Sequence, residues 1–87
     1  MDDQPTLSPQ LIAGLREAVE NQLRDNTPRE ARFTLDRLIA NGISHDQAMK
    51  MIGAALLVEM RDMMVEKRVY NAAKYIALLN RLPMLDD

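Results

Sequence analysis

The eight-residue stretch Met51 to Val58, which consists only of apolar residues and one glycine, is the feature that most constrains the fold of this 87-residue chain. It lies inside residues 44–67, a segment without proline that carries apolar residues at helical spacing, so we predict one long helix there. Eight residues are too few to cross a bilayer, which takes about twenty. The apolar sides of this helix must therefore be buried against other helices or against another chain.

Helix start and stop signals divide the first half of the chain into two helices. Ser8 can accept a hydrogen bond from the free amides of a helix that ends in the turn-forming segment 25–28. Thr27 and Glu30 have the spacing of a capping box and predict the start of a second helix. The dipeptide 41–42, Asn-Gly, supplies a left-handed stop for that helix.

Two further helices follow. Ser44 and Gln47 form a second capping box, which opens a third helix that we expect to run to about Lys67. Asn71 can cap a short fourth helix, which Pro83 ends. Strand alternation and hairpin signals are absent from the sequence. We therefore predict an all-α fold, an irregular four-helix array with a long central third helix.

The composition is that of one globular domain. Hydrophobic residues make up 47% of the chain and charged residues 28%, which supports a folded core. We assign residues 7–83 to a single helical domain and expect residues 1–6 and 84–87 to be loose ends. The chain contains no cysteine, which fits a reducing compartment, and its acidic start does not resemble an export signal. These features predict a cytoplasmic protein.

The third helix is apolar on two sides. The predicted core stripe consists of Met49, Ile52, Gly53, Leu56, Leu57, Met60, Met63 and Met64. Nearly opposite lies a second line, which we define as Met51, Val58 and Val65, spaced by seven residues, with Ala54 and Ala55 beside it. A helix exposed to water on that side would not need these apolar residues, so we expect the second line to be covered.

Charged residues separate the two apolar sides of the third helix. The basic residues are Lys50 and Arg61, and the acidic residues on the other side are Glu59, Asp62 and Glu66. Opposite charges that flank an apolar seam are typical of self-complementary helix pairing. We therefore predict a homodimer interface formed by Met51, Ala54, Ala55, Val58, Arg61, Asp62 and Val65. The alternative is that the second line packs under the first or fourth helix, which would make the third helix the central rod of one core.

Gly53 and the methionines of the third helix each have two interpretations. A glycine inside a helix costs about 1 kcal/mol relative to alanine, which indicates that another helix packs closely over Gly53; the alternative is a tolerated weakness. The five methionines within residues 49–64 indicate core filling, with an adaptable partner-binding groove as the alternative.

No group of residues predicts catalysis or metal binding. His45 is the only histidine, and Met49 occupies the place where a zinc-binding helix would carry its second imidazole. Ser44 is explained as a helix cap, and no third group is implied that would orient His45 as a base. We expect no enzyme activity, no cofactor, no metal site and no small-molecule substrate.

The three acidic residues of the third helix resemble half of a carboxylate metal site, but no second helix supplies the Glu-x-x-His pair that such a site needs. We interpret Glu59, Asp62 and Glu66 as a solvated acidic face. Its candidate ion-pair partners are Arg29, Arg32 and Arg81.

The junction of the second and third helices has the spacing of a helix-turn-helix. Its second helix would offer His45, Asp46, Gln47 and Lys50 to base edges before it becomes apolar. Candidate phosphate contacts are Arg24, Arg29, Arg32 and Arg37. The net charge of −2 lacks the basic excess of a nucleic-acid-binding domain. A helix-turn-helix-like nucleic-acid-associated regulator is therefore our alternative function, after a protein-interaction module.

The segments "GISHDQAMKMIGAALLVEM" and "YNAAKYIALLNRLP" resemble a small helical domain of unknown function in uncharacterised bacterial proteins. The resemblance covers roughly residues 35–83. In related sequences a second histidine often follows the first by four residues, and here that residue is Met49. The resemblance therefore implies a bacterial helical domain and gives no activity to expect.

Overall fold

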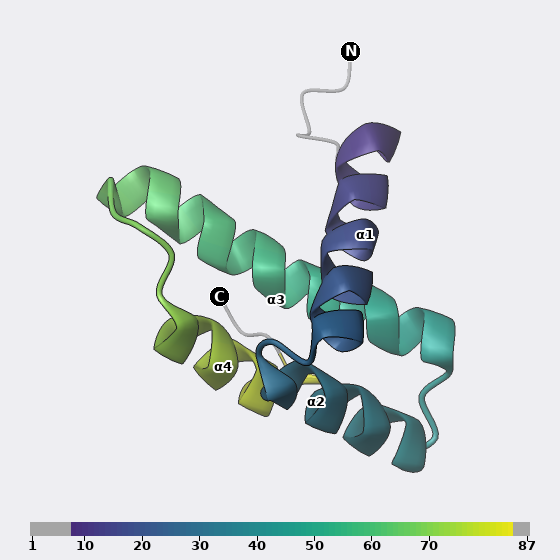
Figure 1. Cartoon of the computed structure of the whole chain (residues 1–87). Helices are drawn as coiled ribbons and strands as arrows, with labels where there is room; N and C mark the ends of the chain where they lie inside the picture. The colour runs from purple at the N-terminus through teal and green to yellow at the C-terminus, as the bar shows by residue number, and fades with distance from the viewer. Residues whose placement is uncertain (1–7, 85–87) are drawn as a thin grey trace.

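Four α-helices make up the fold in a computed structural model of the chain, which describes residues 8–84 (Figure 1). They are α1 (Pro9–Asp25), α2 (Arg29–Ala40), α3 (His45–Glu66) and α4 (Ala72–Arg81). Residues 8–84 contain no strand, and α3 is the longest helix with 22 residues. The predicted all-α fold with a long third helix is confirmed.

The predicted loose ends lie almost wholly outside the described residues. Residues 1–6 and 85–87 are not among them, so those expectations stay predictions. Met84 is described, and its backbone amide donates a hydrogen bond to the carbonyl of Arg81 at 2.9 Å. This residue is therefore held against the last turn of α4.

Side-chain caps fix the starts of three helices. The side-chain oxygens of Ser8, Ser44 and Asn71 each accept a hydrogen bond from the backbone amide three residues further on, at 3.0, 3.1 and 3.2 Å. Each cap satisfies one of the amides that the first turn of a helix leaves without an intrahelical partner. The predicted starts of α1, α3 and α4 are confirmed.

The start of α2 differs from the prediction. The helix begins at Arg29, with Pro28 in the cap position, so Thr27 lies one residue too early to act as the cap. The Thr27 hydroxyl instead donates a hydrogen bond to the carbonyl of Asp25 at 3.1 Å. The predicted stop is confirmed, because Gly42 has a φ of 93°, in the left-handed region that glycine adopts easily.

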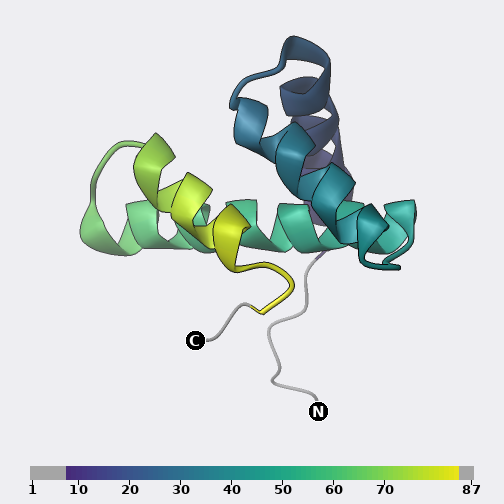
Figure 2. The ribbon, with the colours of Figure 1, turned by 90° about the horizontal axis from the view of Figure 1, so that it is seen from below.

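The other three helices pack around α3. Each of α1, α2 and α4 contacts it. In Figure 1, α1 crosses in front of α3, and α2 and α4 lie below it. Seen from below (Figure 2), these three helices rise from one side of α3, and no helix within residues 8–84 covers the opposite side. The third helix is therefore central, yet only part of its circumference is covered, and its C-terminal end extends past α1 (Figure 1).

The predicted core stripe of α3 is confirmed only in part. Its buried members are Met49, Ile52, Gly53 and Leu56. Its remaining members are the half-buried Leu57 and Met63 and the exposed Met60 and Met64. The core side of α3 is rotated toward Ala48, Ala55 and Glu59, which are all buried, because α2 and α4 pack on that side. The methionines near the end of the helix therefore lie outside the core.

Two polar links join helices that are distant in sequence. The guanidinium of Arg37 in α2 donates to the carbonyls of Leu82 and Leu79 at 2.7 and 3.0 Å, which satisfies the free carbonyls at the end of α4. The hydroxyl of Tyr75 in α4 donates to Oε1 of Gln22 in α1 at 2.8 Å. Burial raises the pKa of Tyr75, so its hydroxyl stays protonated and remains a donor. These links fix how α2, α4 and α1 lie relative to one another.

Candidate interaction surface

The second line, Met51, Val58 and Val65, runs from the covered to the uncovered part of α3. Met51 is half-buried and packs against the core, Val58 is half-buried, and Val65 is 74% exposed. The central-rod interpretation therefore describes the Met51 end of the line. The Val65 end remains available to a partner.

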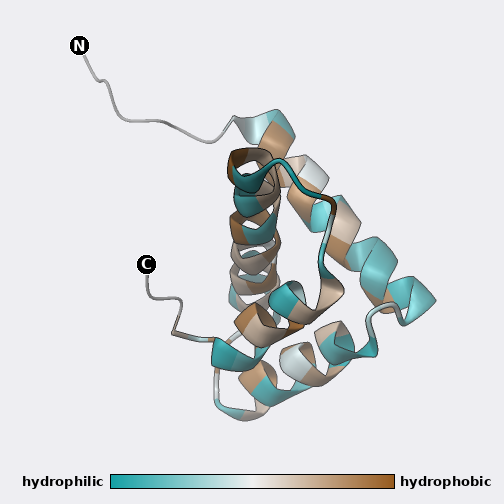
Figure 3. Cartoon of the chain, turned by 90° about the vertical axis from the view of Figure 1, so that its left-hand side faces the viewer, coloured by the Kyte–Doolittle hydropathy of each residue, from teal (hydrophilic) through white to brown (hydrophobic). Residues whose placement is uncertain are grey.

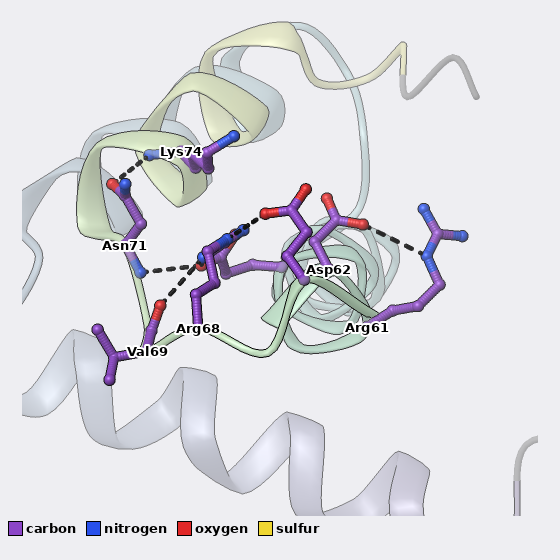
Figure 4. Close-up of polar contacts among 8 residues, drawn as sticks. Arg61, Asp62, Arg68, Val69, Asn71 and Lys74 are labelled. Atoms are coloured by element: carbon purple, nitrogen blue, oxygen red, sulfur yellow. Dashed lines mark hydrogen bonds and ion pairs between the residues drawn. The ribbon is translucent and has the colours of Figure 1, made fainter. Parts of the chain in front are cut away.

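The other predicted interface residues differ in the same way. Ala55 is fully buried in the chain's own core and cannot contact a partner. Ala54 and Arg61 are exposed, and Asp62 is half-buried. Arg61 Nε lies 3.6 Å from Asp62 Oδ1, and Figure 4 shows this pair beside the connection from α3 to α4. The structure thus keeps Ala54, Arg61 and Val65 of the predicted interface on the surface.

Exposed apolar side chains concentrate at the C-terminal end of α3 and in the connection that follows it. Nine large hydrophobic side chains within residues 8–84 are exposed, and five of these belong to residues 60–70. They are Met60, Met64, Val65, Val69 and Tyr70. Figure 3 looks onto this end of the molecule, where hydrophobic and hydrophilic segments alternate. Scattered exposed apolar residues are ordinary in a soluble protein, but a concentration of them marks a candidate interaction site.

An ion pair between the buried Glu59 and the half-buried Arg68 holds this end of the molecule together. The Glu59 side chain is 0% exposed, and its two oxygens accept hydrogen bonds from Nη1 and Nη2 of Arg68 at 2.8 and 3.0 Å. The backbone amide of Asn71 donates to the same carboxylate at 2.9 Å (Figure 4). We call Glu59, Arg68 and Asn71 the clasp. The two-pronged geometry matches the planar guanidinium to the carboxylate and satisfies both of its oxygens.

The clasp keeps Glu59 ionised. The Arg68 guanidinium and, to a lesser extent, the Asn71 amide hold the pKa of Glu59 below its usual range, although burial alone would raise it. Hydrogen bonds to Glu59 and Glu66 raise the pKa of Arg68. Both charges of this pair are therefore present at neutral pH.

The clasp also fixes the connection between α3 and α4. Lys67 ends α3 in the left-handed conformation with a φ of 53°, and the next residue, Arg68, reaches back to Glu59 and also donates to the carbonyl of Val69 at 3.1 Å. Tyr70 lies against Tyr75, with ring centroids 6.2 Å apart. The exposed side chains of Val69 and Tyr70 are therefore presented by a held segment of backbone.

The predicted solvated acidic face on α3 is wrong for Glu59. Glu59 is buried because it lies one helical turn from Ala55 on the side that faces α4. Its partner is Arg68, and Glu66 also pairs with Arg68, whereas Asp62 pairs with Arg61. The two segregated strips of opposite charge are thus replaced by pairs within the chain. The i,i+9 spacing of Glu59 and Arg68 across a helix end is a weak signal, since it carries information only once the path of the connection is known.

A partly open groove lies between α1 and α3, and the sequence analysis did not identify it. Its volume is about 390 Å³, and its lining consists of Ile12, Leu15, Arg16, Met49, Lys50, Gly53, Ala54 and Leu57. α1 packs against α3 at Gly53, where an added Cβ would lie 3.8 Å from Leu15 Cβ. That distance is an ordinary van der Waals contact, so α1 does cover Gly53, as predicted, but the approach is not unusually close and leaves room for a methyl group. The glycine was the one signal of this groove in the sequence.

The remaining candidate residues show no assembled chemistry. His45 is exposed in the first turn of α3, and Ser44 is used as the cap. No group of three or more His, Asp or Glu side chains in the described part of the chain is placed to hold a metal ion. Among the candidate phosphate contacts, Arg37 binds the end of α4, and Arg24 lies 3.3 Å from Asp25.

Comparison of the chain with protein-family models, with curated proteins and with solved structures found no match. None of the helices in residues 8–84 has the length and apolar character needed to cross a membrane.

Proposed function

We propose that this chain is a protein-interaction module that self-associates through the uncovered side of α3 and has no catalytic activity. The observation that supports it is the concentration of exposed apolar side chains in residues 60–70, next to the uncovered end of the second line. Val58 and Val65 of the second line belong to this surface. Met64, which is 79% exposed, adds a further apolar side chain to it. Covering these groups on association removes apolar area from water.

Rigidity of the surface supports the same proposal. The clasp holds residues 67–71 in one arrangement, so little conformational freedom is lost when a partner binds there. A chain of 87 residues also buries a comparatively small fraction of its surface when it folds alone. Pairing two copies through α3 would extend the core of each.

A helix-turn-helix-like regulator is the second candidate. It is supported by Arg29 and Arg32, which are exposed on α2 and have no ion-pair partner within residues 8–84. Against it, Asp46 in the first turn of α3 holds both Arg16 and Lys50, at 2.7 and 3.4 Å, where a recognition helix would offer free cations. Binding to DNA at low salt that weakens in Arg29→Gln and Arg32→Gln would support it, and no retention at low salt would remove it.

The molar mass in solution tests the main proposal. Light scattering across a concentration series is expected to show the mass of two chains at tens of micromolar protein. Val58→Lys places a charge in the middle of the second line and should shift the protein to the monomer. Because Val58 is half-buried, Val65→Lys provides a second variant at a position that is 74% exposed and does not contribute to the core.

A matched control separates the interface from a general effect of added charge. Ala40→Lys adds the same charge at an exposed position at the end of α2 and should leave the molar mass unchanged. Circular dichroism should show equal helix content in all three variants. An equal loss of association in Ala40→Lys and Val65→Lys would contradict the assignment of the interface to α3.

A further inference from the structure

We infer that the groove between α1 and α3 binds an aliphatic carboxylate, a ligand with one unbranched apolar chain and one anionic head. The groove shares Ala54 with the predicted interface but contains none of Met51, Val58 and Val65, and binding there does not depend on self-association. It rests on the shape of the groove, on the composition of its lining and on the cations at its rim.

The lining of the groove suits an apolar chain. Six of its eight residues are apolar or glycine, and they come from both helices. Gly53 has no side chain there. A methyl group added at Gly53 would contact only the Leu15 Cβ, at 3.8 Å, so the two helices leave open space beside this residue. A volume of about 390 Å³ is at the lower end of the range for small-ligand sites, about 300–1,000 Å³.

The charges of the lining select the head group. Arg16 and Lys50 are the two charged residues of the lining, and both are basic. They meet at Asp46, whose oxygens lie 2.7 Å from Arg16 Nη1 and 3.4 Å from Lys50 Nζ. Asp46 thus pairs with both cations, and Glu20 Oε2 also lies 3.4 Å from Arg16 Nε, but neither of these carboxylates lines the groove.

An anionic head placed beside Arg16 and Lys50 complements this arrangement. The hydrogen bonds of Arg16 and Lys50 keep the pKa of Asp46 low, so Asp46 stays charged and remains paired with both basic side chains, which line the groove. The aliphatic stems of the two basic residues extend the apolar wall, as long basic side chains commonly do. A partner helix would fit the apolar part of the groove but would not use this pair of cations.

Binding of dodecanoate, kept below the concentration at which it forms micelles, tests the inference. Titration calorimetry gives the affinity, and amide chemical shifts locate the site, with Gly53 and Ala54 expected to move most. Dodecan-1-ol is the matched ligand without the charge. It should bind about tenfold more weakly, the loss expected when a charge-assisted contact is removed. Equal affinities for the acid and the alcohol would overturn the assignment of an anionic head.

Two variants of α1 locate the site. Ile12→Glu introduces a like charge into the groove and should weaken dodecanoate binding by about tenfold or more. Ala13→Glu adds the same charge at the neighbouring exposed residue, which does not line the groove, and should bind as the unmodified protein does. Equal binding by Ile12→Glu and Ala13→Glu would place the ligand elsewhere and overturn the inference.

Two further measurements test the inference: the ligand preference of a variant at the rim and the molar mass of the Ile12→Glu variant. Arg16→Gln should reduce the preference for dodecanoate over dodecan-1-ol, and an unchanged preference would contradict the role of the rim. Ile12→Glu should retain the molar mass of the unmodified protein, so failure of this inference is distinguishable from failure of the self-association proposal. If dodecanoate binds only to the dissociated chain, the occupant of the groove is a second copy and the inference is overturned.

Discussion

The two halves of α3 are built in opposite ways. In the N-terminal half, Met49, Ile52 and Ala55 are buried under the other helices, and the packing is apolar. In the C-terminal half, the most deeply buried side chain is a charged one, Glu59, while the large apolar residues Met64 and Val65 are exposed. One helix thus has an apolar interior at one end and an ionic interior with an apolar surface at the other.

The difference follows from the neighbours of each half. The N-terminal half faces α2 and leads into the crossing with α1, whereas the C-terminal half extends past α1 and faces α4 and the connection to it (Figures 1 and 2). Where few side chains are available to bury α3, the clasp fixes its direction by hydrogen bonds that have specific geometry. Hydrophobicity alone therefore does not decide which residues of a helix are buried.

Truncating one apolar residue in each half should give the largest contrast. Ile52→Ala removes buried methyl groups from the core and should lower the free energy of unfolding by about 3 kcal/mol. Met64→Ala removes a side chain of similar size from an exposed position and should change the free energy of unfolding by less than about 0.5 kcal/mol. Urea unfolding of both variants measures the difference, and equal losses would contradict the contrast between the halves.

Removing the negative charge of Glu59 from the clasp should have the next largest effect on the free energy of unfolding. Glu59→Gln leaves the Arg68 guanidinium without its buried carboxylate and should lower the free energy of unfolding by about 2 kcal/mol. Glu66→Gln removes the other, half-exposed partner of Arg68 and should cost less than about 1 kcal/mol. If the two variants unfold at the same urea concentration, the clasp does not stabilise the C-terminal half.

Much of the fold could be predicted from the sequence because its signals are local. Ser8, Ser44 and Asn71 each satisfy amides of their own helix, so their roles as caps can be read without knowing the tertiary structure. The rotation of the core toward Glu59 could not be predicted, since it depends on where α4 packs. A glutamate at that position has the same sequence pattern whether it is solvated or paired with a distant arginine.

The candidate surface was predictable to a smaller extent. The spacing of Met51, Val58 and Val65 defines a line on α3, and Ala54 also remains on the surface. The sequence did not show that Ala55 is buried or that Val69 and Tyr70 extend the apolar surface into the connection. The groove was missed because it is formed by two helices, and only Gly53 hinted at it.

Acidification should remove the contribution of the clasp. The pKa of Glu59 is lower in the folded chain than in the unfolded chain, so its stabilising effect is complete above the unfolded value, near about 4.3, and is lost as the pH falls through the folded value. The melting temperature of the unmodified protein should therefore converge on that of Glu59→Gln at acidic pH. A difference between the two that is independent of pH would contradict this account of the clasp.

Replacing single glycines by alanine should have small effects on the free energy of unfolding. Gly53→Ala should raise the free energy of unfolding by about 0.5–1 kcal/mol, because the added methyl meets only Leu15 at ordinary contact distance. Gly14→Ala, with no neighbour within 4 Å, is the matched control in α1 and should gain a similar amount. Gly42→Ala should be destabilising, because its φ of 93° strains any residue with a Cβ. A loss in Gly53→Ala would mean that α1 and α3 pack more tightly than the structure shows.

Cross-linking at the centre of the second line tests most directly whether the uncovered side of α3 meets its copy. The chain contains no cysteine, so Val58→Cys supplies the sole thiol. Val58 is the middle residue of the line, so two copies whose lines pair over their full length place it opposite its counterpart whichever way the helices run. A short bismaleimide should then link two Val58→Cys chains efficiently and leave Ala40→Cys chains unlinked. Equal linking of the two variants, or none in either at tens of micromolar protein, would contradict self-association through α3.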